Sequence, residues 1–283
     1  MSYPALLLNT CDSYLDVLDI QIDLLARSGF FDRSDFDVYV NTELQSLKIK
    51  RLDKKIIFHK NGSVTWGKRF RSSLEKIKHE YILVLFDDYY PENKFNNKKF
   101  LSLMSTVEKG SYDCCYLTPV IKPNKSDSYV SDNLFQLNAN RPFKLNTTAA
   151  VWRREALLEV FSDTDDPWSW EAFSSYRAKA KSLKICSVAE SSEFQFKYSF
   201  STGGAIYRGG WVASVLKSLD LKGDPRIRKS KRPVFDFLDP VKRDMSWKVG
   251  FIVKGFRISI HGALRFLIYA LAKKYRNRFF RQP

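Results

Sequence analysis

The stretch Tyr81-Ile-Leu-Val-Leu-Phe86-Asp87-Asp88 is the segment that decides the fold. Six consecutive apolar residues are typical of a strand buried on both faces, and such strands belong to parallel sheets that are covered by helices. The apolar run ends abruptly at two aspartates. Because ligands bind beyond the carboxyl ends of the strands in open α/β sheets, Asp87 and Asp88 are expected at a ligand site.

The segments around this strand predict an α/β fold. The first ninety residues read as β-α-β-β-α-β, which favours a mostly parallel, Rossmann-type sheet flanked by helices. From apolar spacing, strands are predicted at 5–9, 36–40, 55–59, 81–86, 113–117, 129–137, 147–152, 184–188 and 194–200. Helices are predicted at 14–25, 66–78, 100–107, 153–161, 167–179 and 211–219.

The positive charge of the chain is concentrated near its C-terminus. The 283 residues carry a net charge of +16, of which residues 241–283 contribute +10 through eleven basic side chains and one aspartate. With 44% hydrophobic residues the chain can bury a core, so a disordered chain is excluded. The remaining +6 is ordinary for a globular enzyme.

Targeting and redox signals favour a reduced, cytoplasmic protein. The four cysteines show no CxxC spacing, and the N-terminus lacks the basic region of a signal peptide. The most apolar later stretch, residues 251–272, is interrupted by Lys254, Arg257, His261 and Arg265, so no membrane-spanning helix is expected.

Three regions are expected along the chain: a catalytic domain at 1–222, a proline-containing charged linker at 223–245 and a helical tail at 246–283. In the tail, apolar residues recur every three to four positions beside a basic stripe, a pattern typical of a helix that lies on an anionic membrane. Two alternatives are that the apolar stripe packs on the catalytic domain or that the basic end binds nucleic acid. Glycines at 250, 255 and 262 also allow two shorter helices.

The aspartate pair at 87–88 predicts a metal site. Adjacent carboxylates repel each other unless a cation or a hydroxyl-bearing ligand is present, and such pairs bind Mg²⁺ or Mn²⁺ together with substrate phosphates. The alternative is a pair of turn-forming residues. The chain has neither GxGxxG nor GxxxxGK[ST], so phosphates would need a metal or basic side chains such as Lys68, Arg69 and Arg71.

Two further segments carry groups that suit a sugar-nucleotide enzyme. Thr10 and Asp12 follow the first strand and could bind a base or ribose, although Asp12 could instead cap a helix. In the segment 163–171, tryptophan faces could stack on sugar C–H surfaces while Glu171 accepts a hydroxyl proton. The alternative is that Trp168 and Trp170 are ordinary core residues.

The order of these motifs resembles bacterial GT-A-type glycosyltransferases of O-antigen- or capsule-like polysaccharide biosynthesis. The resemblance begins with Trp66-x₂-Arg69-x₄-Leu74-x₂-Ile77 leading into the strand that ends at Asp87-Asp88. In that family a helix precedes a strand with an acidic DXD-like motif, which holds the nucleotide-sugar diphosphate through a divalent metal. Later blocks at 148–157, 166–171 and 205–211 also resemble the family, and together the similarity covers residues 5–220.

The resemblance implies roles for particular residues. A nucleotide-sugar donor would be bound by Thr10, Asp12, Trp66, Arg69 and Asp87. A divalent metal, Mn²⁺ or Mg²⁺, would be bound by Asp88 and Asp87, although Tyr89 stands where the third position of a full Asp-x-Asp would fall. An acceptor glycan would be bound by Trp168 and Trp170, with Glu171 as the base of an inverting reaction and Asp166 or Asp165 as alternatives.

The predicted protein is therefore a glycosyltransferase that transfers sugar from a nucleotide donor to a hydroxyl of a lipid-linked bacterial glycan. It is expected at the inner face of the plasma membrane, bound peripherally through the tail, without a nucleic-acid partner. The first alternative is a nucleotidyltransferase acting on sugar phosphates, although its Gly-rich basic signature is missing. The second is a non-enzymatic membrane- or nucleic-acid-binding module.

Overall fold

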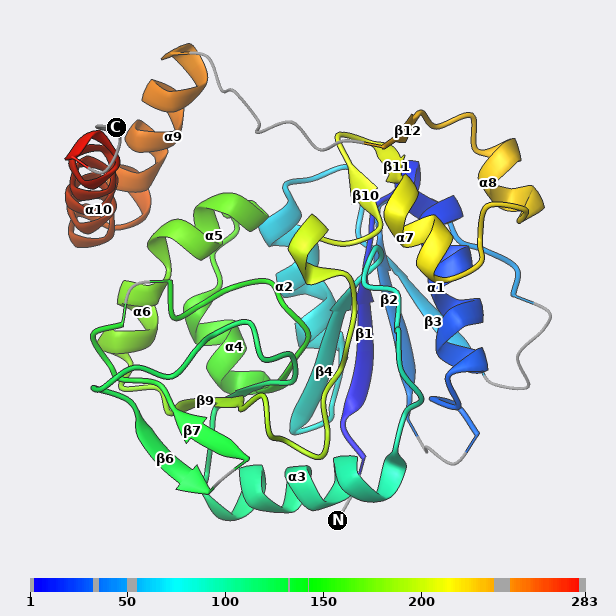
Figure 1. Cartoon of the computed structure of the whole chain (residues 1–283), viewed down its shortest axis with the longest axis horizontal. Helices are drawn as coiled ribbons and strands as arrows, with labels where there is room; N and C mark the ends of the chain where they lie inside the picture. The colour runs from blue at the N-terminus through cyan, green and yellow to red at the C-terminus, as the bar shows by residue number, and fades with distance from the viewer. Residues whose placement is uncertain are drawn as a thin grey trace.

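A nine-stranded sheet runs through the centre of the protein (Figure 1). The computed structural model describes residues 3–32, 36–49, 55–131, 133–141, 143–236 and 245–279. The strand order is β3-β2-β1-β4-β8-β5-β9-β7-β6. The strands are β1 (Ala5–Asn9), β2 (Val38–Thr42), β3 (Ile56–Lys60), β4 (Tyr81–Phe86), β5 (Cys114–Tyr116), β6 (Ser128–Ser131), β7 (Leu134–Gln136), β8 (Ala150–Arg153) and β9 (Ile185–Val188).

The sheet is mixed, which corrects the expectation of a mostly parallel sheet. The N-terminal strands β1 to β4 are parallel, as is the β5–β9 pair. The β4–β8, β5–β8, β7–β9 and β6–β7 pairs are antiparallel. The short apolar runs after residue 110 report burial but not strand direction, so the sequence could not distinguish the two arrangements. The α/β class with flanking helices is confirmed.

Helices cover both faces of the sheet, and β4 shows why. Its side chains alternate, so Leu83 and Leu85 join the core under α1 and α3, whereas Ile82 and Val84 join the core under α2 and α4. The helices of the two layers are α1 (Leu15–Arg27), α2 (Trp66–Lys76), α3 (Asn97–Lys109), α4 (Arg154–Val160), α5 (Pro167–Phe173) and α6 (Ser175–Ala180).

Three predicted elements differ from the structure. Residues 129–137 form the β6–β7 hairpin rather than one strand. The predicted strand at 194–200 is not a strand, although Phe194, Phe196 and Tyr198 are buried in the core as its alternation requires. The predicted helix at 211–219 starts with the short strand β11 (Gly210–Val212) and continues as α7 (Ala213–Ser218).

A second, three-stranded sheet takes one of its strands from the predicted linker. Here β10 (Ile206–Tyr207), β11 and β12 (Val234–Phe235) pair in that order, and α8 (Pro225–Lys229) precedes β12. Arg226 forms an ion pair with Asp23 of α1 at 2.9 Å, and Arg232 with Asp16 at 2.7 Å. Residues 223–236 are therefore folded onto the domain rather than forming a linker, and residues 237–244 lie outside the described residues.

The tail forms two helices, α9 (Met245–Ile258) and α10 (Ile260–Phe279), which lie at the edge of the molecule beyond α5 (Figure 1). Both contact α5. The alternative of two shorter helices is thus correct, and part of the tail packs on the domain, as the alternative of packing on the catalytic domain expected. Among the described residues, no helix combines the length and apolar character that crossing a bilayer requires.

Candidate active site

Polar side chains gather where β1, β2 and β4 end, at the edge of the sheet that faces β10 and β11 (Figure 1). The amide of Asn41 donates to the side-chain oxygen of Asn9 (2.6 Å), and Asn61 donates to Asn41 (3.0 Å). This chain of amides, of which Asn9 and Asn41 are buried, connects the ends of three neighbouring strands. The sequence analysis missed it, although an asparagine near the end of each of three successive strands was a visible signal.

Asp87 is buried beside the end of β1. Its Oδ2 accepts a hydrogen bond from the Thr10 hydroxyl at 2.5 Å. Burial raises the pKa of Asp87 to about 7, while the Thr10 hydrogen bond and the charge of Arg232 act in the opposite direction. Arg232 forms its own ion pair with Asp16, so it does not neutralise Asp87 by direct contact. Thr10 and Asp87 are therefore brought together as predicted.

Asp88 lies under a glycine turn that the sequence analysis did not single out. The φ of Gly204 is +114°, and a Cβ there would lie 2.4 Å from Oδ2 of Asp88, so only glycine allows this approach. The backbone N–H of Ala205 donates to the Asp88 carbonyl at 3.0 Å. The pKa of Asp88 is raised well above its ordinary value, first by burial and then by the charge of Asp87.

The carboxylate oxygens of Asp87 and Asp88 fit a divalent cation that would also bind the phosphate of a ligand. Two neighbouring carboxylates with raised pKa values are poorly compensated by the protein, and burying such charges without a partner is costly. Among the described residues, no cluster of three or more His, Cys, Asp or Glu side chains forms a complete metal cage. Mg²⁺ and related ions are commonly bound by one or two carboxylates, with water and substrate phosphates completing the shell.

Glu171 of α5 is held toward the same edge by Thr147. Its Oε1 accepts hydrogen bonds from the backbone N–H (2.7 Å) and hydroxyl (2.6 Å) of Thr147. The Tyr89 hydroxyl donates to the carbonyl of Thr147 at 2.8 Å, and the Tyr89 ring stacks on Tyr198 with centroids 4.2 Å apart. A chain of contacts therefore connects Glu171 to the residue that follows Asp88. Thr147 and Tyr89 are positioning residues that spacing alone could not reveal.

The other carboxylates of this block have structural partners. Asp165 forms an ion pair with Arg177 at 2.6 Å and is fully buried. Asp166 caps α5 by accepting from the backbone N–H of Ser169 at 2.8 Å, and it also forms an ion pair with Lys254 of α9. These partners do not fit a general base, which must be free to accept a proton. Of the three predicted candidates, Glu171 alone keeps this freedom.

Two residues predicted to bind the donor have partners within the protein. The Asp12 carboxylate accepts hydrogen bonds from the backbone N–H groups of residues 43–45, so it stabilises that turn instead of capping a helix. Arg69 forms an ion pair with Glu43. Asp12 and Arg69 both lie near the strand ends, but the carboxylate of Glu43 already balances the charge of Arg69. Arg71, with a bond to Asp163 at 2.9 Å, is balanced in the same way.

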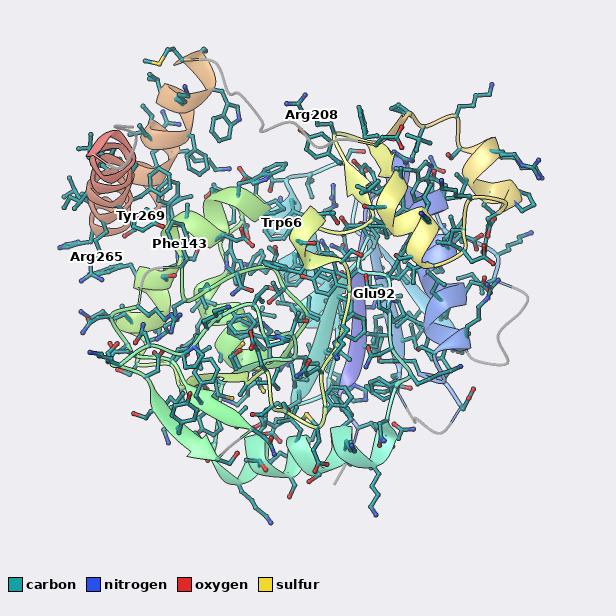
Figure 2. The ribbon with its side chains drawn as sticks, in the orientation of Figure 1. Trp66, Glu92, Phe143, Arg208, Arg265 and Tyr269 are labelled. Atoms are coloured by element: carbon teal, nitrogen blue, oxygen red, sulfur yellow. The ribbon has the colours of Figure 1, made fainter. Side chains whose placement is uncertain are left out.

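The three tryptophans have different environments. Trp170 is 3% exposed and packs on Trp152 and Phe161, so its faces are not open for a sugar, which corrects its predicted role. Trp66, on the α5 side of the site in Figure 2, also packs on Phe161. Trp168 is 59% exposed, which fits an acceptor surface.

A small cavity lies between Phe86 and Thr147. Phe86 directly precedes Asp87 in the sequence, and Thr147 contacts Glu171. The cavity is lined by Trp66 and Trp170, whose indole nitrogens are buried and have no hydrogen-bond partner in the part of the chain that the structure describes. The space open to the centre of a water molecule is about 20 Å³, which is enough for one water. A larger groove of about 430 Å³ between α3 and β7 contains none of the predicted site residues.

The sequence matches no protein-family model and no curated protein. Among solved structures, it is similar to S. aureus TarS 1–349, with 14% identity, a TM-score of 0.47 and coverage of 68% of this chain and 59% of that one. It is also similar to a UDP-glucose pyrophosphorylase complexed with UDP-glucose (10% identity, TM-score 0.44, 70% and 92% covered). A third is 2-C-methyl-D-erythritol 4-phosphate cytidylyltransferase from Thermus thermophilus (14%, 0.41, 71% and 95%). The match spans about three fifths of the TarS structure.

Proposed function

We propose that this protein is a glycosyltransferase that moves a sugar from a nucleotide donor to a glycan hydroxyl with inversion at the anomeric carbon. One observation carries the proposal: an uncompensated carboxylate pair, Asp87 and Asp88, lies at the sheet edge, and a separate carboxylate, Glu171, is linked to it through Thr147 and Tyr89. The pair suits a metal and a diphosphate, and the separate carboxylate suits a base.

The donor site lies at the ends of β1 and β4. Asp87 and Asp88 would hold Mn²⁺ or Mg²⁺, and Thr10 keeps Asp87 oriented through its hydrogen bond. When bound, the cation supplies positive charge that stabilises the departing diphosphate. The nucleoside would lie beside Thr10 and Asp12, where the 43–45 turn closes the edge. Gly204 leaves room for the approach of Asp88 and of the metal that Asp88 would bind.

Glu171 would act as the base. Its Oε1 is engaged by Thr147, which leaves Oε2 to accept the proton of the acceptor hydroxyl. As the acceptor oxygen forms its bond to the anomeric carbon, the bond from that carbon to the diphosphate oxygen breaks. The electron pair leaves with the nucleoside diphosphate, and the proton stays on Glu171. Attack opposite the leaving group gives inversion.

The acceptor would approach along α5, where Trp168 offers an exposed aromatic face for a sugar ring. We further propose that the acceptor is carried on a lipid and that the enzyme works at the inner face of the plasma membrane, attached through α9 and α10. The basic tail would thus bind lipid rather than nucleic acid. The catalytic domain then includes the predicted 1–222 together with the folded part of residues 223–236.

A thermal-shift screen tests the donor site, because a ligand that binds only the folded state raises the melting temperature. UDP-, GDP-, CMP- and dTDP-sugars should be compared with and without Mn²⁺. We expect one nucleotide class to stabilise the protein only when Mn²⁺ is present, and the Asp88→Asn variant to lose that shift. Release of pyrophosphate from a nucleoside triphosphate and a sugar phosphate would instead identify a nucleotidyltransferase.

A further inference from the structure

The two C-terminal helices expose a regular apolar stripe. Each helix has four large apolar residues at positions i, i+4, i+8 and i+11, which lie on one side of a helix. All eight side chains are between 38% and 70% exposed. They are Met245, Val249, Val253 and Phe256 of α9, and Ile260, Leu264, Ile268 and Leu271 of α10. We name this set the outer stripe.

A different side of the same helices is already occupied by the domain. The ring of Phe173 in α5 contacts Phe251 and Phe266, with centroid distances of 4.9 and 5.5 Å. A Cβ on Gly255 would lie 2.5 Å from that ring, so glycine permits the close approach. At the other end of the contact, Phe143 packs on Tyr269 (Figure 2). The outer stripe is therefore not the surface that holds the tail on α5.

The charge of the tail identifies the partner of the outer stripe. Residues 245–283 contain nine Lys and Arg residues and no Asp or Glu. An apolar stripe within a purely basic segment matches the interface of an anionic bilayer, where apolar side chains enter the acyl boundary and cations meet lipid phosphates. Nucleic acid would satisfy the charge but would leave eight apolar side chains in water.

We propose that α9 and α10 form a two-sided platform, with one side fixed on α5 and the outer stripe inserted in an anionic membrane. The consequence concerns orientation, and this part rests on the proposed function. The platform is bound to both ends of α5, through Phe173 near its C-terminus and through the Lys254–Asp166 ion pair at its N-cap. Since α5 also carries Trp168 and Glu171, a membrane-bound platform holds the acceptor side of the site at the lipid surface.

Vesicle co-sedimentation at physiological salt tests this proposal without donor or acceptor, so its failure is separate from failure of the transferase assignment. The probes are phosphatidylcholine vesicles with and without phosphatidylglycerol. We expect the full chain to bind the anionic vesicles and to bind neutral ones far more weakly. Replacing three outer-stripe residues, Ile260→Glu, Leu264→Glu and Ile268→Glu, should weaken binding by at least about tenfold.

Two matched variants separate the contributions. Tyr129→Glu with Val130→Glu changes exposed apolar residues outside the tail and should leave vesicle binding and melting temperature unchanged. Arg257→Gln with Arg265→Gln should weaken binding to anionic vesicles by about fivefold for each charge removed.

Full vesicle binding by the triple glutamate variant would overturn the proposal. The proposal would also be overturned if light scattering showed a stable dimer of the unmodified protein and a monomer of the triple glutamate variant. The outer stripe would then bind a second copy of the chain. Preferential binding of duplex DNA that is insensitive to the glutamates would also contradict it.

Discussion

The chain has two pairs of adjacent aspartates that look alike in the sequence but differ in the structure. The edge pair, Asp87 and Asp88, follows β4, and burial raises both pKa values. The helix pair, Asp165 and Asp166, precedes α5 and makes ion pairs. Both pairs satisfy the same sequence pattern, so the pattern alone does not locate a metal site.

The difference lies in how each charge is compensated. The helix pair is balanced by Arg177 and Lys254, and Asp166 is also an N-cap, so its charges serve the stability of the fold. The edge pair accepts a hydrogen bond from the Thr10 hydroxyl but makes no ion pair among the described residues, so the proposed cation would come from outside the chain. Uncompensated carboxylates at a strand end are thus better evidence of a ligand site than the presence of acidic residues.

The largest expected effect is on the edge pair. Asp88→Asn keeps the side-chain shape but removes the charge that would bind the metal, so sugar transfer should fall by at least about a thousandfold, as metal-stabilised departure of the diphosphate is lost. Release of nucleoside diphosphate measures this. The matched change in the helix pair, Asp166→Asn, should cost less than about tenfold. Equal losses in both variants would mean that the two pairs have the same role.

The second effect concerns Glu171. A general base contributes roughly a hundredfold to ten-thousandfold, so Glu171→Gln should lower kcat within that range. The amide oxygen can still accept from Thr147, so donor binding should be unchanged in titration calorimetry. Full activity in Glu171→Gln would show that another group takes the proton.

The third effect is on stability and belongs to the helix pair. Asp165→Asn leaves the partly buried Arg177 without its counter-charge, which should cost about 3 kcal/mol. The melting temperature should fall by about 6–12 °C for a chain of this size. Replacing both partners, Asp165→Asn with Arg177→Met, should recover much of the loss. If the single variant unfolds no earlier than the unmodified protein, the ion pair does not stabilise the fold.

The smallest effect is the pH dependence of the edge pair. Because the pKa of Asp87 is raised from 3.8 to about 7, the folded state binds this proton more tightly than the unfolded state. The associated stability is present below pH 4 and is lost as pH rises through 7. Asp87→Asn should therefore gain stability relative to the unmodified protein between pH 5 and 8, seen in thermal unfolding as a rise of a few degrees in melting temperature. A constant difference across this range would contradict the raised pKa.

The sequence predicts the N-terminal half of the fold well and the rest less well. The run 81–86 identifies a central strand because its six apolar residues leave no solvent-facing side. The direction of β8 could not be predicted, since its three apolar residues do not indicate in which direction the strand runs. The prolines and charges of residues 223–236 are typical of a linker, and local sequence does not report the long-range ion pairs of Arg226 and Arg232.

The same reason limits prediction of the site. Asp87, Asp88 and Thr10 follow strand ends, so topology alone brings them together. By contrast, Thr147 and Gly204 act through contacts across more than twenty positions, which no local pattern reports. Trp170 shows the converse, because a tryptophan predicted to stack on a sugar belongs to the core.

Titration of Mn²⁺ with a nucleoside diphosphate at pH 8 and at pH 5.5, followed by calorimetry, tests the central claim most directly. If the edge pair is the metal site, binding should be strong at pH 8 and much weaker at pH 5.5, where Asp87 is protonated. It should disappear in Asp88→Asn and persist in Asp166→Asn. Metal-dependent binding that survives Asp88→Asn, or that is equal at the two pH values, would contradict the account.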